Sequence, residues 1–136
     1  MALEASPLAT SPVVGFIPIS EPAPALAFYR DKLGLTLVED QTPFALVFQS
    51  GTGLGSTMIR ATFAAGFKPQ PFTILGWQVT DIESTVQTLT NAGVVFTRYA
   101  GMNDSHPLAI WTAPGGTKVA WFQDPFGNVL SLQQDN

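Results

Sequence analysis

The sequence predicts an α+β fold in which two βαβββ repeats form a curved mixed sheet around a cleft. A strand-like segment, a capped helix and a terminating glycine occur at residues 14–34 and again at 74–93. Residues 47–49 (Val-Phe-Gln) and 121–123 (Trp-Phe-Gln) also correspond, and each triplet precedes a turn and a last strand. Two copies of one unit imply a pseudo-symmetric pair of sheets. We therefore expect the functional site in the cleft between them.

The first repeat is predicted to cover residues 13–65. Its helix begins at Ser20 or Glu21, which are suitable caps, and ends at Leu33, where Gly34 supplies a left-handed C-cap. Pro22 is tolerated in the first turn of that helix. The strands of this repeat are expected at Val13–Ile19, Leu35–Val38, Phe44–Gln49 and Ser56–Phe63.

The second repeat is predicted to cover residues 72–133, after a proline-containing linker at 66–71. Its helix is expected at Asp81–Ala92, and its strands at Phe72–Val79, Val94–Tyr99, Leu108–Thr112, Thr117–Gln123 and Asn128–Gln133. Residues 1–12 lack the basic start and long apolar stretch of a signal peptide. We interpret them as a flexible leader and expect a cytoplasmic protein.

The turn at 124–128 (Asp-Pro-Phe-Gly-Asn) predicts the register of the last hairpin. A proline followed two residues later by glycine favours a type I turn with a bulge, which pairs Asp124 with Asn128. Trp121 then lies opposite Ser131 and points to the cleft. The wholly apolar set that points to the helices is Ala120, Phe122, Leu130 and Leu132. A slip of one residue would exchange the two faces.

Composition excludes several classes of protein. The 136-residue chain is 46% hydrophobic and 12% charged, which is typical of one folded domain rather than of a disordered chain. A net charge of −4 with only six Lys and Arg argues against nucleic-acid binding. No apolar run approaches the roughly eighteen residues of a membrane span, so no membrane partner is expected. Without cysteine there is neither a disulfide nor a thiolate metal site.

Two motifs within the doubled plan carry a resemblance to a known family. They are residues 28–35 (Phe-Tyr-Arg-Asp-Lys-Leu-Gly-Leu), at the end of the first helix, and the turn at 124–128. Their order and spacing resemble the vicinal oxygen chelate superfamily, which includes glyoxalase I, bleomycin-resistance proteins and extradiol dioxygenases. The resemblance covers residues 13–133 and implies a homodimer that completes or covers the cleft.

The resemblance also implies where a divalent metal ion would bind in the superfamily's enzymes. Four cleft-facing positions, usually His, Glu or Gln, fall here on Val14, Arg60, Ile74 and Ser131. Aliphatic side chains do not ligate metals, a guanidinium carries a permanent positive charge, and serine is a poor ligand for such ions. We therefore expect no catalytic metal ion and no other cofactor.

Strand parity predicts which side chains line the cleft. The candidate ligand-binding residues are Phe16, Val47, Met58, Arg60, Gln78, Trp121 and Ser131. We expect a planar ligand against Trp121 and Phe16, with an anionic group on Arg60, the only charge in the set. Alternatively, the two aromatic residues fill a core or dimer interface, and Arg60 forms an internal salt bridge or lies at a solvated rim.

No catalytic residue is identified by the sequence. The single histidine, His106, lies in a loop of surface composition at 103–107, where a solvent-exposed position is favoured over a role as general base. A metal-independent small-molecule-binding protein of the bleomycin-resistance type fits best. The alternatives are a metal-independent lyase or isomerase that acts on a metabolite or antibiotic, and an interaction module whose cleft is filled by another protein chain.

Overall fold

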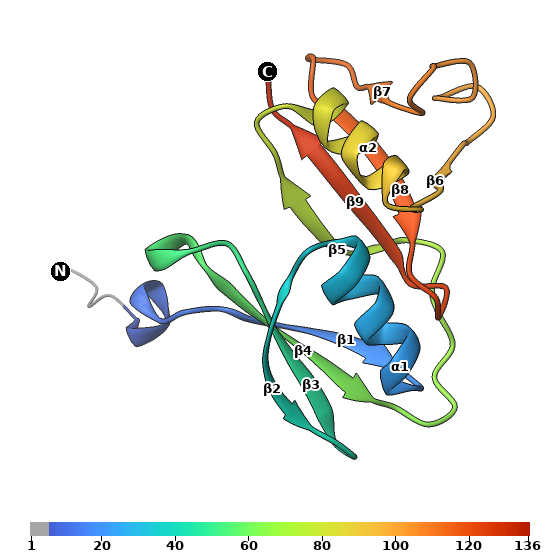
Figure 1. Cartoon of the computed structure of the whole chain (residues 1–136). Coiled ribbons are helices and arrows are strands. Elements are labelled where there is room, and N and C mark those ends of the chain that lie inside the picture. The colour runs from blue at the N-terminus through green and yellow to red at the C-terminus, as the bar shows by residue number, and fades with distance from the viewer. Residues whose placement is uncertain (1–5) are drawn as a thin grey trace, which may run out of the picture.

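The structure, a computed structural model, describes residues 6–136 and contains both predicted repeats (Figure 1). The first repeat comprises β1 (Val14–Ile19), α1 (Pro22–Ala25) with its π-helical continuation η2 (Leu26–Lys32), β2 (Thr36–Gln41), β3 (Ala45–Ser50), a short 3-10 turn η3 (Gly53–Gly55) and β4 (Thr57–Phe63). The second comprises β5 (Thr73–Gln78), α2 (Ile82–Asn91), β6 (Phe96–Thr97), β7 (Trp111–Thr112), β8 (Lys118–Gln123) and β9 (Val129–Gln134).

The strands form two mixed sheets of equivalent topology, which confirms the α+β class and the doubled unit. The first sheet has the order β1-β4-β3-β2, and the second has the order β5-β9-β8-β6, with β7 paired to β8. In each sheet the first and last strands of the repeat are parallel, and the other pairs are antiparallel. Both helices lie in front of the strands in Figure 1. We call the side of the two sheets that faces away from the helices the open face.

The chain departs from the predicted elements at a few places. The first five positions of the predicted leader lie outside the described residues, and Pro7–Thr10 forms an exposed 3-10 turn, η1. The strand expected at Val94–Tyr99 is reduced to Phe96–Thr97, because the backbone then turns into a folded loop. Glu21 occupies the N-cap position of α1 but makes no side-chain hydrogen bond there. Within residues 6–136, no helix has both the length and the apolar character needed to cross a bilayer.

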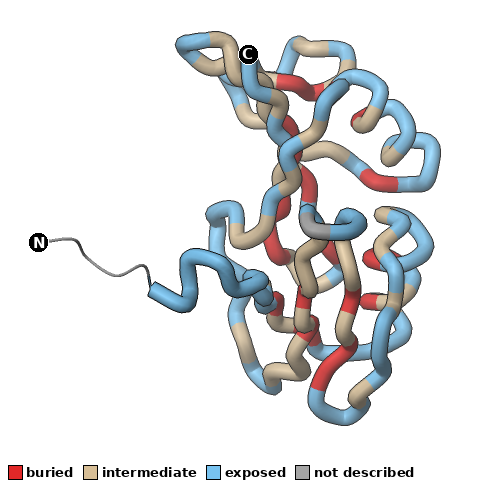
Figure 2. Tube along the Cα trace, turned by 90° about the vertical axis from the view of Figure 1, so that its left-hand side faces the viewer, coloured by how far each residue is buried: buried red, intermediate tan, exposed pale blue. Residues whose placement is uncertain are grey.

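The core lies between the helices and the sheets. Buried residues, red in Figure 2, are concentrated in the strands of both repeats, whereas the connecting loops are mostly exposed. Phe48 of β3 and Phe122 of β8 occupy equivalent places, and both are fully buried. Phe122 contacts the aromatic rings of Phe28, Trp77 and Phe96 at centroid distances of 5.3–6.3 Å. The core is therefore one continuous cluster that both repeats share.

The last hairpin has the predicted register. The Asp124 N–H donates to Asn128 O at 3.0 Å, and Gly127 takes the left-handed conformation with φ 88°. Trp121 pairs with Ser131 in the ladder. The four residues assigned to the helix side, Ala120, Phe122, Leu130 and Leu132, are all buried. Trp121 and Ser131 therefore lie on the open face, as the turn chemistry predicts.

A buried polar network joins the two repeats at this turn. The Tyr29 hydroxyl of η2 donates to Asp124 Oδ2 at 2.5 Å, and the N–H groups of Phe126 and Asn128 donate to Asp124 Oδ1 at 2.9 Å. Asn128 Nδ2 donates to Asp124 Oδ2 and to the Pro18 carbonyl of β1, each at 2.8 Å. Burial, reinforced by the neighbouring Asp124, raises the pKa of the Tyr29 hydroxyl well above its ordinary value. Because folding raises this pKa, the Tyr29 hydroxyl stabilises the folded state at pH values below the unfolded tyrosine pKa of about 10. This contribution to the free energy of unfolding is lost at higher pH.

Candidate functional site on the open face

Ladder pairing aligns several candidate residues in two rows on the open face. In the first sheet, Val47 pairs with Arg60, and Arg60 pairs with Phe16. In the second sheet, Ser131 lies between Trp121 and the side-chain-free Gly76. Because the two sheets share one topology, these rows occupy equivalent positions in the two repeats. Five of the seven candidate residues thus fall into the two rows.

The two rows lie in different sheets. The strands β1 and β5 touch where Gly15 lies against the Leu75 side chain. A Cβ added to Gly15 would be 3.9 Å from Leu75 Cδ1. From Arg60 to Trp121 the strands follow one another as β4, β1, β5, β9 and β8, and three of these four steps are hydrogen-bonded pairs, since β1 and β5 belong to different sheets. At about 4.8 Å each, the three paired steps amount to roughly 14 Å along the sheets, and the contact between β1 and β5 adds to this separation. The structure thus brings Phe16 beside Arg60 and Trp121 beside Ser131, but does not place Phe16 and Trp121 in one contact.

Trp121 borders a small hollow. Its ring is partly buried, packs edge-on against Tyr99 at a centroid distance of 5.3 Å, and lies 5.9 Å from the ring of Trp111. The hollow beside it has a volume of about 220 Å³. It is lined by Pro71, Phe72, Thr73, Tyr99, Met102, Trp121 and Val129. An apolar hollow with an aromatic wall is suited to a flat ring.

Arg60 is the charged group of the site. It is partly exposed, and its cross-strand neighbours are apolar. Among residues 6–136, its guanidinium makes no salt bridge, and the only such pair there is Arg30–Asp31. Phe16 beside it is 64% exposed and is therefore not part of the core. An arginine without an internal counter-charge, flanked by an exposed ring, can bind an anionic group.

The remaining two candidate residues lie two positions away from the rows, Met58 before Arg60 on β4 and Gln78 after Gly76 on β5. Met58 is partly buried on β4, where it pairs with Val14. Gln78 is exposed on β5, and its Nε2 donates to Asp135 Oδ2 at 2.8 Å. The Gln78 amide is thus engaged by the C-terminal segment, so a ligand would have to compete with Asp135 for it.

The positions implied for a metal ion do not fit one. Val14 and Ser131 lie on the open face, where they offer an isopropyl group and a hydroxyl, and Arg60 offers a cation. Ile74 lies at a shift of register between Thr73 and Leu75 and packs against the core. Its aliphatic side chain offers no ligand atom to a metal ion. Within the described part of the chain, no three His, Asp or Glu side chains are grouped as metal ligands would be.

A folded loop positions Tyr99 and Met102 beside Trp121, and Asn103 holds it. Asn103 is buried, its Oδ1 accepts from the Tyr99 N–H at 2.7 Å, and its Nδ2 donates to the carbonyls of Thr97 and Ala109 at 2.9 and 2.6 Å. Sequence reasoning missed Asn103, because an asparagine in a polar stretch is typical of any surface loop. The only available signal was its place among the turn residues of 101–107.

His106 has a structural role in the same loop. Its Nδ1 accepts from the N–H groups of Leu108 and Ile110 at 3.0 and 3.2 Å. The His106 carbonyl accepts from Arg98 Nη1 at 2.6 Å. The side chain is only partly exposed, which corrects the expectation of a solvent-exposed histidine. It is occupied in holding the loop.

Comparison with known proteins identifies the family. Residues 11–132 match the family described as the Glyoxalase/Bleomycin resistance protein/Dioxygenase superfamily. No curated protein matches the sequence. A crystal structure of a glyoxalase family protein from Bacillus anthracis is similar with a TM-score of 0.67 at 16% identity, and the match covers 100% of both chains.

Two further crystal structures show the same fold. A superfamily member from Sphaerobacter thermophilus is 22% identical, with a TM-score of 0.67 over 92% of this chain and 97% of that one. TioX from Micromonospora sp. ML1 is 16% identical, with a TM-score of 0.64 over 93% of this chain and 99% of that one. At these identities the structural likeness concerns the fold alone. The match over residues 11–132 shows that the chain belongs to the glyoxalase/bleomycin resistance protein/dioxygenase superfamily.

Proposed function

We propose that the protein binds an elongated small molecule on the open face without a metal ion. One end of the ligand is a flat ring in the hollow beside Trp121, and the other is an anionic group held by Arg60. The observation that carries the proposal is the Arg60 guanidinium, which has no counter-charge among the described residues and lies in a row with Phe16. The spacing of the two rows calls for a ligand longer than a single ring. Turnover of such a ligand would instead favour the metal-independent lyase or isomerase.

A series of 2-naphthyl carboxylates tests the role of Arg60. Replacement of Arg60 by Met should weaken the binding of 6-(2-naphthyl)hexanoate by roughly fivefold. This corresponds to about 1 kcal/mol for a partly exposed ion pair. The same change should leave the dissociation constant of 2-naphthoate within about twofold of its value for the unchanged protein, because the carboxylate of this compound is too close to the ring to reach β4. Dissociation constants from titration calorimetry measure both effects.

Arg30→Ala is the matched control, since Arg30 is an exposed arginine on the helix side, paired with Asp31. It should change neither affinity. Equal losses for the short and long carboxylates on Arg60→Met would mean that Arg60 acts through the overall charge of the protein. That result would contradict a contact between Arg60 and the ligand.

Metal independence is tested by thermal unfolding. Treatment with a chelator should leave the melting temperature unchanged, and zinc, nickel, manganese or iron should not raise it. The reason is that an ion that binds only the native state must stabilise that state by mass action. A reproducible stabilisation by one equivalent of metal, abolished by a change at His106, would show that the metal site lies elsewhere than the implied positions.

We also propose a homodimer, as members of the superfamily commonly cover their clefts in this way. The start of the first repeat supports the proposal, since Val13, just before β1, and Val14 and Phe16 on β1 are 70%, 47% and 64% exposed. Sedimentation at micromolar concentration should therefore give twice the 14.5 kDa mass of the chain. A single species of the chain mass would reject the dimer and leave the fold untouched. The cytoplasmic location expected from the sequence stays a prediction.

A further inference from the structure

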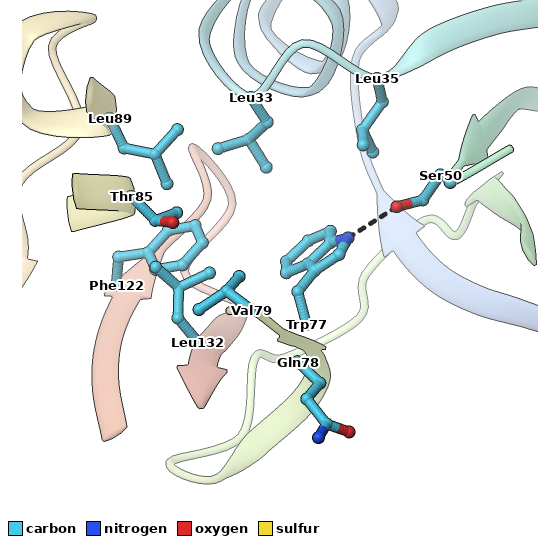
Figure 3. Close-up of a pocket in the computed structure, with 11 residues that line it drawn as sticks. Leu33, Leu35, Ser50, Trp77, Gln78, Val79, Thr85, Leu89, Phe122 and Leu132 are labelled. Atoms are coloured by element: carbon cyan, nitrogen blue, oxygen red, sulfur yellow. Dashed lines mark hydrogen bonds between the residues drawn. The ribbon is translucent and has the colours of Figure 1, made fainter. Parts of the chain in front are cut away.

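A second cavity lies between the two repeats on the helix side of the sheets. Its volume is about 340 Å³, within the usual range for small-molecule sites. Both repeats contribute to its wall, as Figure 3 shows. The lining residues are Leu33, Leu35, Ser50, Gly51, Trp77, Gln78, Val79, Thr85, Leu89, Phe122 and Leu132.

This cavity is separate from the site on the open face. Trp77 points to the helix side, where its ring stacks on Phe122 at a centroid distance of 6.3 Å. Gly76, its neighbour on β5, faces the opposite way, in the row with Ser131. In Figure 3 the Gln78 side chain likewise points away from the Trp77 ring. A molecule in this cavity and one beside Trp121 would therefore lie on opposite faces of the second sheet.

The polar groups of the cavity are few and uncharged. Trp77 Nε1 donates to Ser50 Oγ at 2.8 Å, which occupies the indole N–H (Figure 3). The Thr85 hydroxyl donates to the Asp81 carbonyl at 2.8 Å. Among the described residues, the Ser50 hydroxyl accepts a hydrogen bond and donates none. One O–H donor is thus available beside the Trp77 ring.

We propose that this cavity binds a neutral, largely apolar ring molecule that carries one hydrogen-bond acceptor. The apolar wall favours a ring, and the absence of charged side chains from the lining disfavours an ion, whose desolvation nothing there would offset. The Ser50 hydroxyl donates to the acceptor of the ligand, while Trp77 fixes the orientation of that hydroxyl through its own bond. The ligand class differs from the anion proposed for the open face, and the inference does not depend on that proposal.

Two probes of one shape test the inference: 1-indanone, a bicyclic ketone, and indane, which lacks the carbonyl oxygen. The three tryptophan indole N–H signals in a ¹H–¹⁵N spectrum, assigned by single Trp→Phe variants, report on both faces at once. Titration with 1-indanone should shift the Trp77 signal saturably at millimolar concentration or below.

The variant Ser50→Ala measures the hydrogen bond. This change should weaken the binding of 1-indanone by about fivefold, the usual contribution of one such hydrogen bond. The binding of indane should weaken by less than about twofold. Ser84→Ala, a change at an exposed serine of α2, is the matched control and should alter neither affinity. The dispersion of the spectrum shows that each variant is folded.

Three outcomes of the spectral titration would overturn the proposal. The first is a Trp77 signal that does not move, which would make the cavity a packing gap. The second is a shift of Trp121 in place of Trp77. The third is a Trp77 signal that moves with protein concentration alone, because a second copy of the chain would then fill the cavity. An equal loss of affinity for 1-indanone and for indane in the Ser50→Ala variant would also overturn the proposal, since the hydroxyl would then not recognise the acceptor.

Discussion

Replacing Asp124 with alanine should lower the free energy of unfolding by about 3–5 kcal/mol, the range seen when one partner of a buried polar pair is removed. Asp124 is 5% exposed, and its carboxyl group accepts from the Tyr29 hydroxyl, two backbone N–H groups and the Asn128 amide. Alanine removes the acceptor of all four donors, three of which make buried hydrogen bonds. Because a domain of this size is stable by only about 5–15 kcal/mol, urea unfolding should show a large shift of the midpoint.

Two further variants isolate the network. Tyr29→Phe should cost about 1.5–3 kcal/mol, the value of one hydrogen bond to a charged group, and should contribute little more in the Asp124→Ala background. Asp104→Ala, a change at an exposed aspartate, should stay within about 0.5 kcal/mol of the parent. Additive losses for Tyr29 and Asp124 would contradict the claim that they act as one network.

The local features of the fold could be predicted from the sequence. The proline and glycine of the turn at 124–128 fix the hairpin register, so the open face of β8 and β9 follows from turn chemistry. Asp81 caps α2 by accepting from the Ser84 N–H at 3.1 Å, and Gly34 takes the left-handed conformation after η2, with φ 79°. In each case a few neighbouring residues determine the structure.

Features that depend on distant residues could not be predicted in the same way. Tyr29 and Asp124 are 95 positions apart, so neither residue indicates that the other is its partner. The register shift at Ile74 depends on how β5 pairs with β9, and strand parity alone does not reveal it. The helix-side cavity likewise arises where Ser50 and Trp77, 27 positions apart, meet at the junction of the repeats. Parity predicts the face of a strand, whereas a cavity requires the packing of both repeats.

Replacement of Trp121 by alanine should weaken the binding of 6-(2-naphthyl)hexanoate by more than tenfold, about 1.4 kcal/mol or more. The ring forms the aromatic wall of the hollow, and aromatic pairs contribute roughly 0.5–1.5 kcal/mol beyond the area that they bury. Stability should fall by less than the roughly 3–5 kcal/mol of a core tryptophan truncation, because the ring is only partly buried.

A matched pair of phenylalanines extends this test to the first sheet. Phe16 and Phe44 are 64% and 71% exposed, but only Phe16 is a neighbour of Arg60 in the row. Phe16→Ala should weaken the binding of 6-(2-naphthyl)hexanoate, whereas Phe44→Ala should leave the affinity for this ligand unchanged. An equal effect of both changes would indicate a nonspecific loss of apolar surface.

The central claim is that the open face is a ligand site and that Trp121 belongs to it. It is tested most directly by measuring the affinity for 6-(2-naphthyl)hexanoate and the free energy of unfolding on one preparation of the Trp121→Ala protein. We expect the affinity to fall more than tenfold, about 1.4 kcal/mol or more, while most of the stability is retained. A severe loss of stability with unchanged affinity in the folded fraction would place Trp121 in the core and contradict the site.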